Sequence, residues 1–204
     1  MHNIIQAIES RSSTNHFDTT RQISEADIAQ LVRLSTCAPS AYNFQNWKFI
    51  AVRSANAKAR LVAVSFGQQK IAEASVTFII CGTLAAHEQL PRVLKPSVDD
   101  GILPYSVFEE WIAMAAHTHI GNPQLQRDEA IRSASLAAMT LMLAAQGMGL
   151  ATCAMSGFDA IALAQEFHLA VTEVPVILVT VGYSTPGNRP QKPRRPMNEV
   201  ITFA

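Results

Sequence analysis

Apolar and polar residues alternate along the chain in short blocks that predict both helices and strands. Apolar residues recur at helical spacing over residues 2–10 and again after Ser24, where Asp27 follows three positions on as in a capping box. Two shorter helices are predicted over residues 56–64 and 158–169. Runs rich in β-branched and apolar residues predict strands over residues 47–53, 75–82, 150–154, 174–183 and 199–203. Because helices and strands alternate irregularly, the pattern predicts an α+β layer fold, with a mixed central sheet flanked by helices, and not a doubly wound parallel sheet.

The longest stretch without a charged residue, residues 133–158, is long enough to cross a bilayer. Gln146, Gly147 and Gly149 interrupt it, however, and its many alanines suit close packing in a protein core. We interpret it as a buried helix that opens at Asp128 and ends at the Gly-Met-Gly sequence. No membrane partner is expected.

Residues 84–126 have the least regular pattern. Pro91, Pro96 and Pro104 are expected to break the first half, whereas residues 107–116 predict a helix. We interpret the helix over residues 107–116 as a lid or cap.

The composition favours one domain that associates with a partner. The 204 residues contain no linker-like segment, so residues 1–204 are interpreted as a single domain. With 49% hydrophobic and 16% charged residues, the chain has more apolar material than a monomer of this size usually buries, and a homo-oligomer is the simplest explanation. The formal net charge is zero, which gives no global electrostatic case for nucleic acid or an anionic membrane.

The three cysteines indicate a reducing compartment. Cys37, Cys81 and Cys153 are widely spaced among apolar residues and are predicted to be buried free thiols. The N-terminal sequence lacks the features of a secretion signal, so a cytoplasmic location is expected.

Common catalytic signatures are missing from the sequence. It has no nucleophile elbow, phosphate-binding loop, zinc-protease motif or dinucleotide-binding glycine motif. His117 and His119 are spaced closely enough to share a metal, but no cysteine or carboxylate joins them at ligand spacing. Solvated histidines are the favoured interpretation, and no metal site is predicted.

Cations and hydroxyl groups concentrate near the two ends of the chain. RSSTN spans Arg11 to Asn15, and the Pro-rich sequence NRPQKPRRP contains the cations Arg189, Lys192, Arg194 and Arg195. A proline-punctuated basic segment is commonly a solvated tail. If the two ends converge, they would instead surround a compact dianion such as a phosphate.

The loop APSAYNFQNWKF, residues 38–49, is unusually rich in uncharged amides and hydroxyls. A simple connection between a helix and a strand needs no such row of donors. The loop is therefore either an ordinary solvated connection or part of a binding site.

Four segments together carry a resemblance to a known family. RSSTNHFD (residues 11–18), APSAYNFQNWKF (38–49), MSGFD (155–159) and KPRRP (192–196) occur in the order and at the approximate spacing of the FMN-dependent nitroreductase family. The chain resembles that family from about Ile4 to its C-terminus. The resemblance implies a nitroreductase-like fold and an intertwined homodimer with a C-terminal extension, with two FMN molecules at the interface, each held by both subunits.

The resemblance also implies a set of FMN-binding residues. At the phosphate and ribityl end it places Arg11, Ser12, Ser13, Lys192 and Arg194. Against the flavin from the partner's loop it places Pro39, Ser40, Ala41 and Asn43. As stacking surfaces for substrates it places Tyr42 and Phe44.

At the flavin ring, the resemblance implies one backbone segment and one cation. The backbone of Met155, Ser156 and Gly157 would lie along the ring, where an N–H group donates to flavin N5. Lys70 matches a lysine near the pyrimidine edge, where a cation stabilises the negative charge of the reduced ring.

The chain departs from the family pattern at three positions. Ser12 stands where the second basic residue of the usual opening would be, and Ser156 stands where some members carry a glutamate. Asn15, which is still expected at the cofactor, stands in place of a usual arginine or lysine. Because Asn15 supplies no charge, Lys70 becomes the expected catalytic cation at the ring.

The function implied by the resemblance is an FMN-dependent NAD(P)H oxidoreductase. It would reduce nitroaromatic, quinone or similar electron-poor acceptors by ping-pong hydride transfer through flavin N5, with NADPH or NADH as electron donor. Two alternatives stay open: the same scaffold acting on activated alkenes, aldehydes or halogenated phenols, and a flavin-binding module without turnover. A nucleic-acid binder is poorly supported because the net charge is zero.

Overall fold

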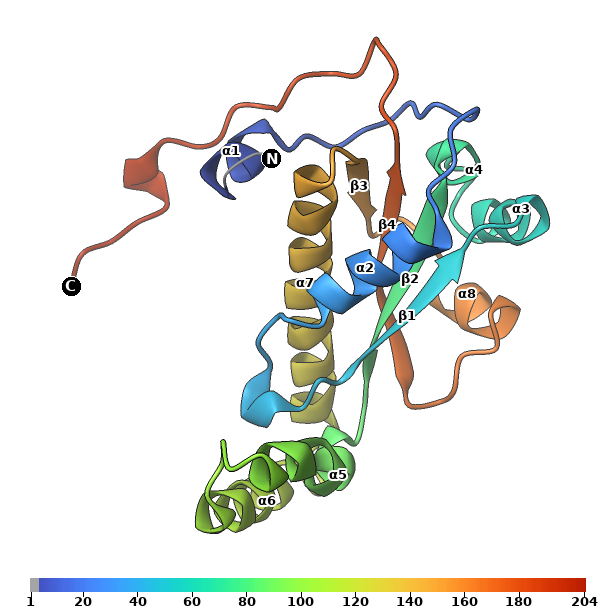
Figure 1. The fold of residues 1–204 in the computed structure, drawn as a ribbon. Coiled ribbons are helices and arrows are strands. Elements are labelled where there is room, and N and C mark those ends of the chain that lie inside the picture. The colour runs from blue at the N-terminus through green and yellow to red at the C-terminus, as the bar shows by residue number, and fades with distance from the viewer. Residues whose placement is uncertain (1–3) are drawn as a thin grey trace.

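A four-stranded sheet forms the centre of the computed structural model, which describes residues 4–204 (Figure 1). The strands are β1 (Trp47–Val52), β2 (Val76–Thr83), β3 (Ala151–Met155) and β4 (Glu173–Gly182), in the order β1-β2-β4-β3. All three strand pairs are antiparallel, so the expectation of a mixed sheet is wrong for these strands, while the α+β class is confirmed. Alternating side chains define the two faces of a strand but carry no information on the direction of its neighbour.

Helices cover both faces of the sheet. One face packs against α2 (Glu25–Ser35) and α7 (Pro123–Gly147), and the other against α3 (Ala55–Ala63), α4 (Lys70–Glu73) and α8 (Ala160–Glu166). The predicted helices and inner strands are thus confirmed within a few residues of their expected ends.

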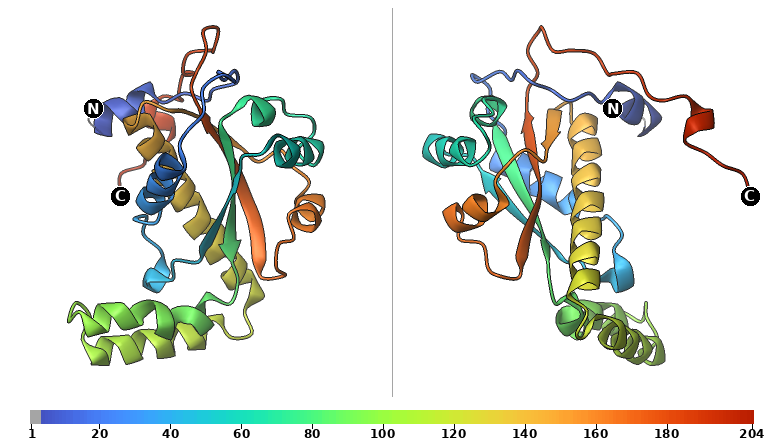
Figure 2. Two further views of the ribbon diagram at one scale, coloured as in Figure 1. Left: turned by 45° about the vertical axis from the view of Figure 1, so that its right-hand side comes forward. Right: turned by 180° about the vertical axis from the view of Figure 1, so that it is seen from behind.

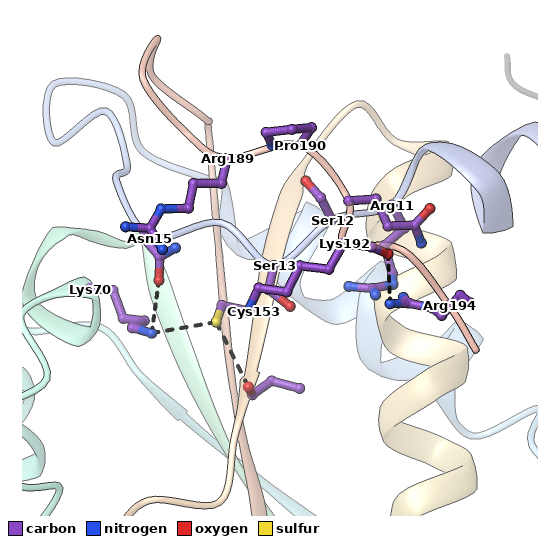
Figure 3. A pocket seen from close by; sticks show the side chains of 12 residues that line it. Arg11, Ser12, Ser13, Asn15, Lys70, Cys153, Arg189, Pro190, Lys192 and Arg194 are labelled. Carbon is purple, nitrogen blue, oxygen red and sulfur yellow. Dashed lines mark hydrogen bonds between the residues drawn. The ribbon is translucent and has the colours of Figure 1, made fainter.

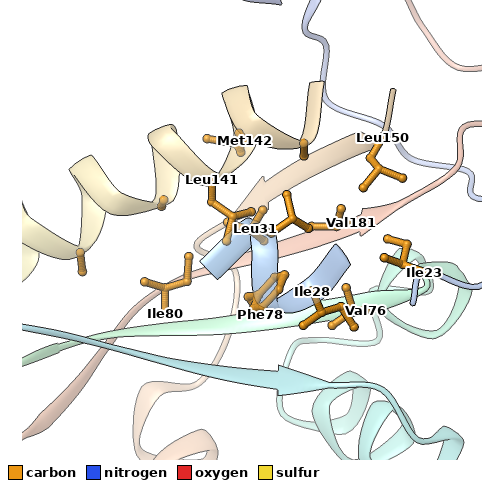
Figure 4. Packing of buried hydrophobic residues seen from close by; sticks show 14 residues of the cluster. Ile23, Ile28, Leu31, Val76, Phe78, Ile80, Leu141, Met142, Leu150 and Val181 are labelled. Carbon is orange, nitrogen blue, oxygen red and sulfur yellow. The ribbon is translucent and has the colours of Figure 1, made fainter. Parts of the chain in front are cut away.

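The central strand β2 contributes side chains to two hydrophobic cores, one on each face of the sheet. Phe78 and Ile80 pack with Leu31 and Leu141 of the α2 and α7 layer (Figure 4). The intervening Ile79 packs on the opposite side, among residues of α3, α4 and α8. Because β2 is buried on both faces, every residue from Val76 to Gly82 is buried, which explains its continuous apolar sequence.

The caps of the helices follow elementary rules. Ser24 Oγ accepts a hydrogen bond from the Asp27 N–H at 3.0 Å, which confirms the predicted start of α2. Helix α7 begins at Pro123, five residues before the expected Asp128, because Asn122 caps it and proline suits the first helical turn. It ends at Gly147, as expected. No helix within residues 4–204 has the length and apolar character needed to cross a membrane.

The predicted break by prolines in residues 84–126 is wrong for Pro91 and Pro96 and correct for Pro104, which lies between two helices. Helix α5 (Ala86–Asp99) continues through Pro91 and Pro96, and α6 (Tyr105–His119) follows it. Leu90 and Leu94 of α5 are fully buried or nearly so and pack with Phe44, so tertiary burial outweighs the cost of about 3 kcal/mol for an interior proline. The two helices form a hairpin at the end of the sheet opposite the chain termini (Figure 2).

Both the N-terminal helix and the C-terminal segment of the described chain lie outside the sheet. Helix α1 (Ile4–Ser10) matches the predicted N-terminal helix, whose residues 2 and 3 lie outside the described part. The predicted strand over residues 199–203 is wrong: this segment is exposed, follows a short 3₁₀ turn, Met197–Glu199, and has no strand partner within residues 4–204.

The prediction of three buried thiols is correct for Cys81 and Cys153 and wrong for Cys37, which is exposed just beyond the end of α2. Burial raises the pKa of the Cys81 thiol to about 12. The folded protein therefore retains this proton at pH values where an unfolded thiol, with a pKa near 9.0, releases it.

This difference predicts a loss of stability in alkali. Between pH 9 and 12 the Cys81 thiol lowers the free energy of unfolding by up to about 1.4 kcal/mol for each pH unit. Urea unfolding at pH 8, 9.5 and 10.5 measures the slope, and a Cys81→Ala variant removes this contribution. Equal pH slopes for the two proteins would contradict the prediction.

Candidate functional site

A cavity of about 240 Å³ lies where the two basic ends of the chain meet (Figure 3). The sequence-predicted residues that line it are Arg11, Ser12, Ser13, Asn15, Lys70, Lys192 and Arg194. Arg189, one of the cations of the basic C-terminal segment, also lines it, and the lining residues that sequence reasoning did not place there are Cys153, Ala154, Pro190 and Gln191. The two ends therefore converge, as one of the two interpretations of the basic segments required.

The N-terminal side of the cavity is an extension of the sheet edge. Ser13 forms a parallel bridge with Thr152 of β3, and the Thr14 N–H donates to the Thr152 carbonyl at 3.0 Å. Further on, Phe17 bridges Ser184, just after β4. These pairings fix the backbone that presents the Ser12 and Ser13 hydroxyls.

Asn188 joins the C-terminal side of the cavity to the N-terminal side. Its Oδ1 accepts from the backbone N–H groups of Asn15, at 2.7 Å, and His16, at 3.1 Å. Its Nδ2 donates to the His16 carbonyl at 2.9 Å and to the Thr185 carbonyl at 3.0 Å. Sequence reasoning missed Asn188 because a turn asparagine carries no sign of its distant partners.

Lys70 lies at the start of the one-turn helix α4 and is partly buried, so it is not an ordinary surface lysine. Its Nζ donates to Asn15 Oδ1 at 3.1 Å and lies 3.7 Å from Cys153 Sγ. No carboxylate within residues 4–204 forms an ion pair with Lys70. Burial raises the pKa of Cys153, and the nearby Lys70 charge opposes this shift only in part, so the thiol is neutral at pH 7.

The charge of the cavity selects its ligand. Five of the lining residues are arginine or lysine, and among the described residues no aspartate or glutamate lines the cavity. Guanidinium groups and serine hydroxyls together match the oxygen atoms of a phosphate. The donor set therefore fits a phosphate-bearing ligand.

Beyond Ala154, the backbone of Met155, Ser156 and Gly157 continues from the edge of the cavity without lining it. The Gly157 carbonyl accepts from Gln68 Nε2 at 2.7 Å, and the Phe158 N–H donates to the Ser156 carbonyl at 3.1 Å. Within residues 4–204 the Gly157 N–H has no partner, so it is a free donor in an exposed segment.

The model of the nitroreductase family matches residues 8–183. The chain belongs to the nitroreductase family. It is 32% identical over 203 residues to a Bacillus subtilis protein named "Putative NAD(P)H nitroreductase YodC", with all of both chains covered.

Two solved structures show the same fold as this nitroreductase. One, from B. subtilis, carries the name "putative nitroreductase ydfN"; it is 29% identical, has a TM-score of 0.91, and the match covers 98% of each chain. The other, a "putative nitroreductase in complex with FMN" from Exiguobacterium sibiricum, is 25% identical with a TM-score of 0.92, and the match covers 100% of this chain and 98% of that one. These likenesses confirm the predicted nitroreductase-like fold.

The loop of residues 38–49 lies at the other end of the nitroreductase chain from the cavity. Its 3₁₀ turn, η1 (Ala41–Asn43), contacts α5, so Pro39, Ser40, Ala41 and Asn43 do not reach the cavity of their own chain. Tyr42, Asn43 and Gln45 all have φ between 50° and 56°, a left-handed backbone that asparagine tolerates but that is uncommon for Tyr42 and Gln45 and strains the loop there.

Two expectations about side chains in this region are wrong. Phe44 is only 2% exposed and packs under α5 and α6, so its ring is not a free stacking surface. His119 is 3% exposed and accordingly not solvated; its ring lies edge-on to those of Tyr42 and Phe44. Tyr42 is less buried and keeps its predicted role as a candidate stacking surface.

Proposed function

We propose that this nitroreductase holds FMN with its phosphate in the basic cavity, and uses NADPH or NADH to reduce electron-poor acceptors such as nitroaromatics or quinones. The observation that carries the proposal is the convergence of Arg11, Lys192 and Arg194 with two serine hydroxyls in one cavity, which no carboxylate of residues 4–204 lines. The names of the relatives, an NAD(P)H nitroreductase and a nitroreductase in complex with FMN, support the same donor and cofactor.

Affinity for FMN follows from charge without a glycine-rich loop. Charge-assisted hydrogen bonds contribute about 1.5 to 3 kcal/mol each, and a micromolar ligand requires about 8 kcal/mol. Three or four such bonds from the cavity would supply much of that energy. The phosphate end therefore anchors the cofactor, while the other residues orient its ring.

When bound, FMN would supply the hydride-transfer chemistry that connects the nicotinamide donor to the acceptor. Lys70 supplies fixed positive charge where the reduced ring carries negative charge, because it is the partly buried cation on the sheet side of the cavity. The free Gly157 N–H supplies a hydrogen-bond donor at the ring. Gln68 holds the adjoining carbonyl and so restrains the direction of that donor.

The site is proposed to be completed by a second copy of the chain. Apolar residues of α1 and of the C-terminal segment are exposed, among them Ile4 at 60% and Phe203 at 88%. Because the strained loop lies far from the cavity of its own chain, a partner's loop would supply Ser40, Tyr42 and Asn43 to the flavin. Sedimentation velocity that gives a monomer at micromolar concentration would refute this arrangement.

An anaerobic visible spectrum tests the proposed function. We expect a flavin spectrum, or one that forms when FMN is added, and we expect NADPH or NADH to bleach it. Bleached protein should be reoxidised by a nitroaromatic or a quinone. A flavin that neither nucleotide reduces would favour a binding module without turnover, and no flavin binding would refute the proposal.

Replacing Lys70 by alanine should slow FMN reduction about tenfold or more while weakening FMN binding much less, because its charge matters most after the ring is reduced. Stopped-flow absorbance under anaerobic conditions measures reduction, and FMN fluorescence titration measures binding. Lys95→Ala, on the exposed face of α5, is the control. Unchanged reduction kinetics would argue against the electrostatic role.

A further inference from the structure

The position of the Lys70 ammonium group is set by one hydrogen bond. A lysine side chain is flexible, and a cation stabilises a developing charge well only when it is held in place beforehand. Lys70 Nζ donates to Asn15 Oδ1 at 3.1 Å, and its one other hydrogen-bond contact within residues 4–204, the Cys153 thiol at 3.7 Å, is a weak acceptor (Figure 3). Asn15 is therefore the strong acceptor that fixes the direction of Lys70.

Asn15 is held in turn by the C-terminal segment. Its backbone N–H donates to Asn188 Oδ1 at 2.7 Å. Asn188 also bonds His16, Ser184 and Thr185, so its amide has donor and acceptor partners that define its orientation. The next residue, Arg189, begins the stretch that lines the basic cavity.

Helix α4 is attached to the same N-terminal segment at a second point. Glu73, at the other end of this one-turn helix, accepts from the Phe17 N–H at 3.2 Å. Each end of α4 is thus hydrogen-bonded to residues 15–17, one end through Lys70 and the other through Glu73. A shift of residues 15–17 would move α4 and the Lys70 side chain together.

On the basis of the proposed function, we infer that Asn15 is the positioning residue for Lys70, and that Asn188 makes this position depend on the C-terminal segment. A cation at position 15 would repel Lys70, whereas the asparagine oxygen attracts it. Compared with the family pattern, the chain has one positive charge fewer at position 15, and the remaining positive charge, on Lys70, is oriented by Asn15. The phosphate end and the ring end of the site are thereby linked through two asparagines.

A double-mutant cycle on the midpoint potential of bound FMN tests this inference, because a merely structural role of Asn15 would not act through Lys70. Asn15→Ala should make reduced FMN bind about three- to tenfold less tightly relative to oxidised FMN, and tenfold corresponds to about 30 mV for a two-electron couple. In the Lys70→Ala background the same substitution should leave the potential unchanged. Equal shifts in the two backgrounds, or no shift in the wild type, would overturn the inference.

The apoprotein gives a readout that does not depend on FMN. With ¹⁵N-labelled lysine, the Lys70 Nζ signal, assigned by its loss in Lys70→Ala, should be protected from solvent exchange in the wild type and in Asn15→Asp, which keeps an acceptor oxygen. Protection should be lost in Asn15→Ala. Protection that survives Asn15→Ala would overturn the inference.

Asn188→Ala tests the second link. It should shift the FMN potential in the same direction as Asn15→Ala and add no further shift in the Asn15→Ala background, although it also weakens FMN binding. A shift of equal size in both backgrounds would refute the coupling. Wild-type apoprotein that fails to bind FMN would refute the proposed function and this inference with it. If FMN binds but its midpoint potential does not change in Asn15→Ala, this inference alone is refuted.

Discussion

Replacing both Arg11 and Arg194 by alanine should weaken FMN binding about 30- to 1,000-fold. The two guanidinium groups come from opposite ends of the chain and line one cavity. Hydrogen bonds from arginine to phosphate are strong, but Arg194 is exposed to solvent, so the pair should contribute about 2–4 kcal/mol and not the full value of two buried bonds. Quenching of FMN fluorescence on titration with apoprotein measures the dissociation constant.

The matched control removes two arginines that do not line the cavity. Arg33 lies on the exposed side of α2, and Arg195 directly follows Arg194 in the sequence. Arg33→Ala with Arg195→Ala makes the same change in net charge, so an equal loss of FMN affinity in this variant would show a general electrostatic effect. Full retention of FMN in the Arg11 and Arg194 double variant would refute the phosphate assignment.

Replacing Gly82 by alanine should destabilise the fold by at least about 3 kcal/mol. A Cβ at this position would lie 2.2 Å from the backbone oxygen of Ala130 in α7, and a backbone atom cannot turn aside as a side chain can. Either α7 moves away from β2 or the strand shifts, and both changes disturb the buried layer between them. The free energy of unfolding in urea measures the effect.

Gly147→Ala is the control for Gly82→Ala. Gly147 is the last residue of α7, and a Cβ there would meet no atom within 4 Å. Alanine has the higher helix propensity, so this substitution should leave stability unchanged or raise it by up to about 1 kcal/mol. If the free energy of unfolding of Gly82→Ala is also within about 0.5 kcal/mol of the wild-type value, α7 can move away from β2 without loss of stability, and the prediction is wrong.

Local chemistry made the elements along most of the chain predictable. The Ser24 cap, the apolar run of β2 and Gly149 after α7 each determine structure through their immediate neighbours. The α5 helix was not predictable in this way, because the energy that carries it through Pro91 and Pro96 comes from burial against distant residues.

The candidate site was predictable in its residue types and only in part in its contacts. The cations and serines at the two ends signalled an anion, and the structure brings seven of the predicted residues into one cavity: Arg11, Ser12, Ser13, Asn15, Lys70, Lys192 and Arg194. The hydrogen bonds of Asn188 to Asn15 and His16 span more than 170 positions in the sequence and leave no local trace. The burial of Phe44 depends on α5 and α6, whose packing the sequence pattern did not reveal.

Prolines at positions 190, 193 and 196 punctuate the exposed C-terminal segment that carries Lys192 and Arg194. Each pyrrolidine ring holds φ near −65° and removes a backbone donor, so the segment samples fewer shapes when its site is empty. A chain that is stiff in advance loses less conformational entropy when its cations close on an anion. The affinity of this site is therefore expected to owe part of its strength to Pro193 and Pro196, two residues that line no part of the cavity.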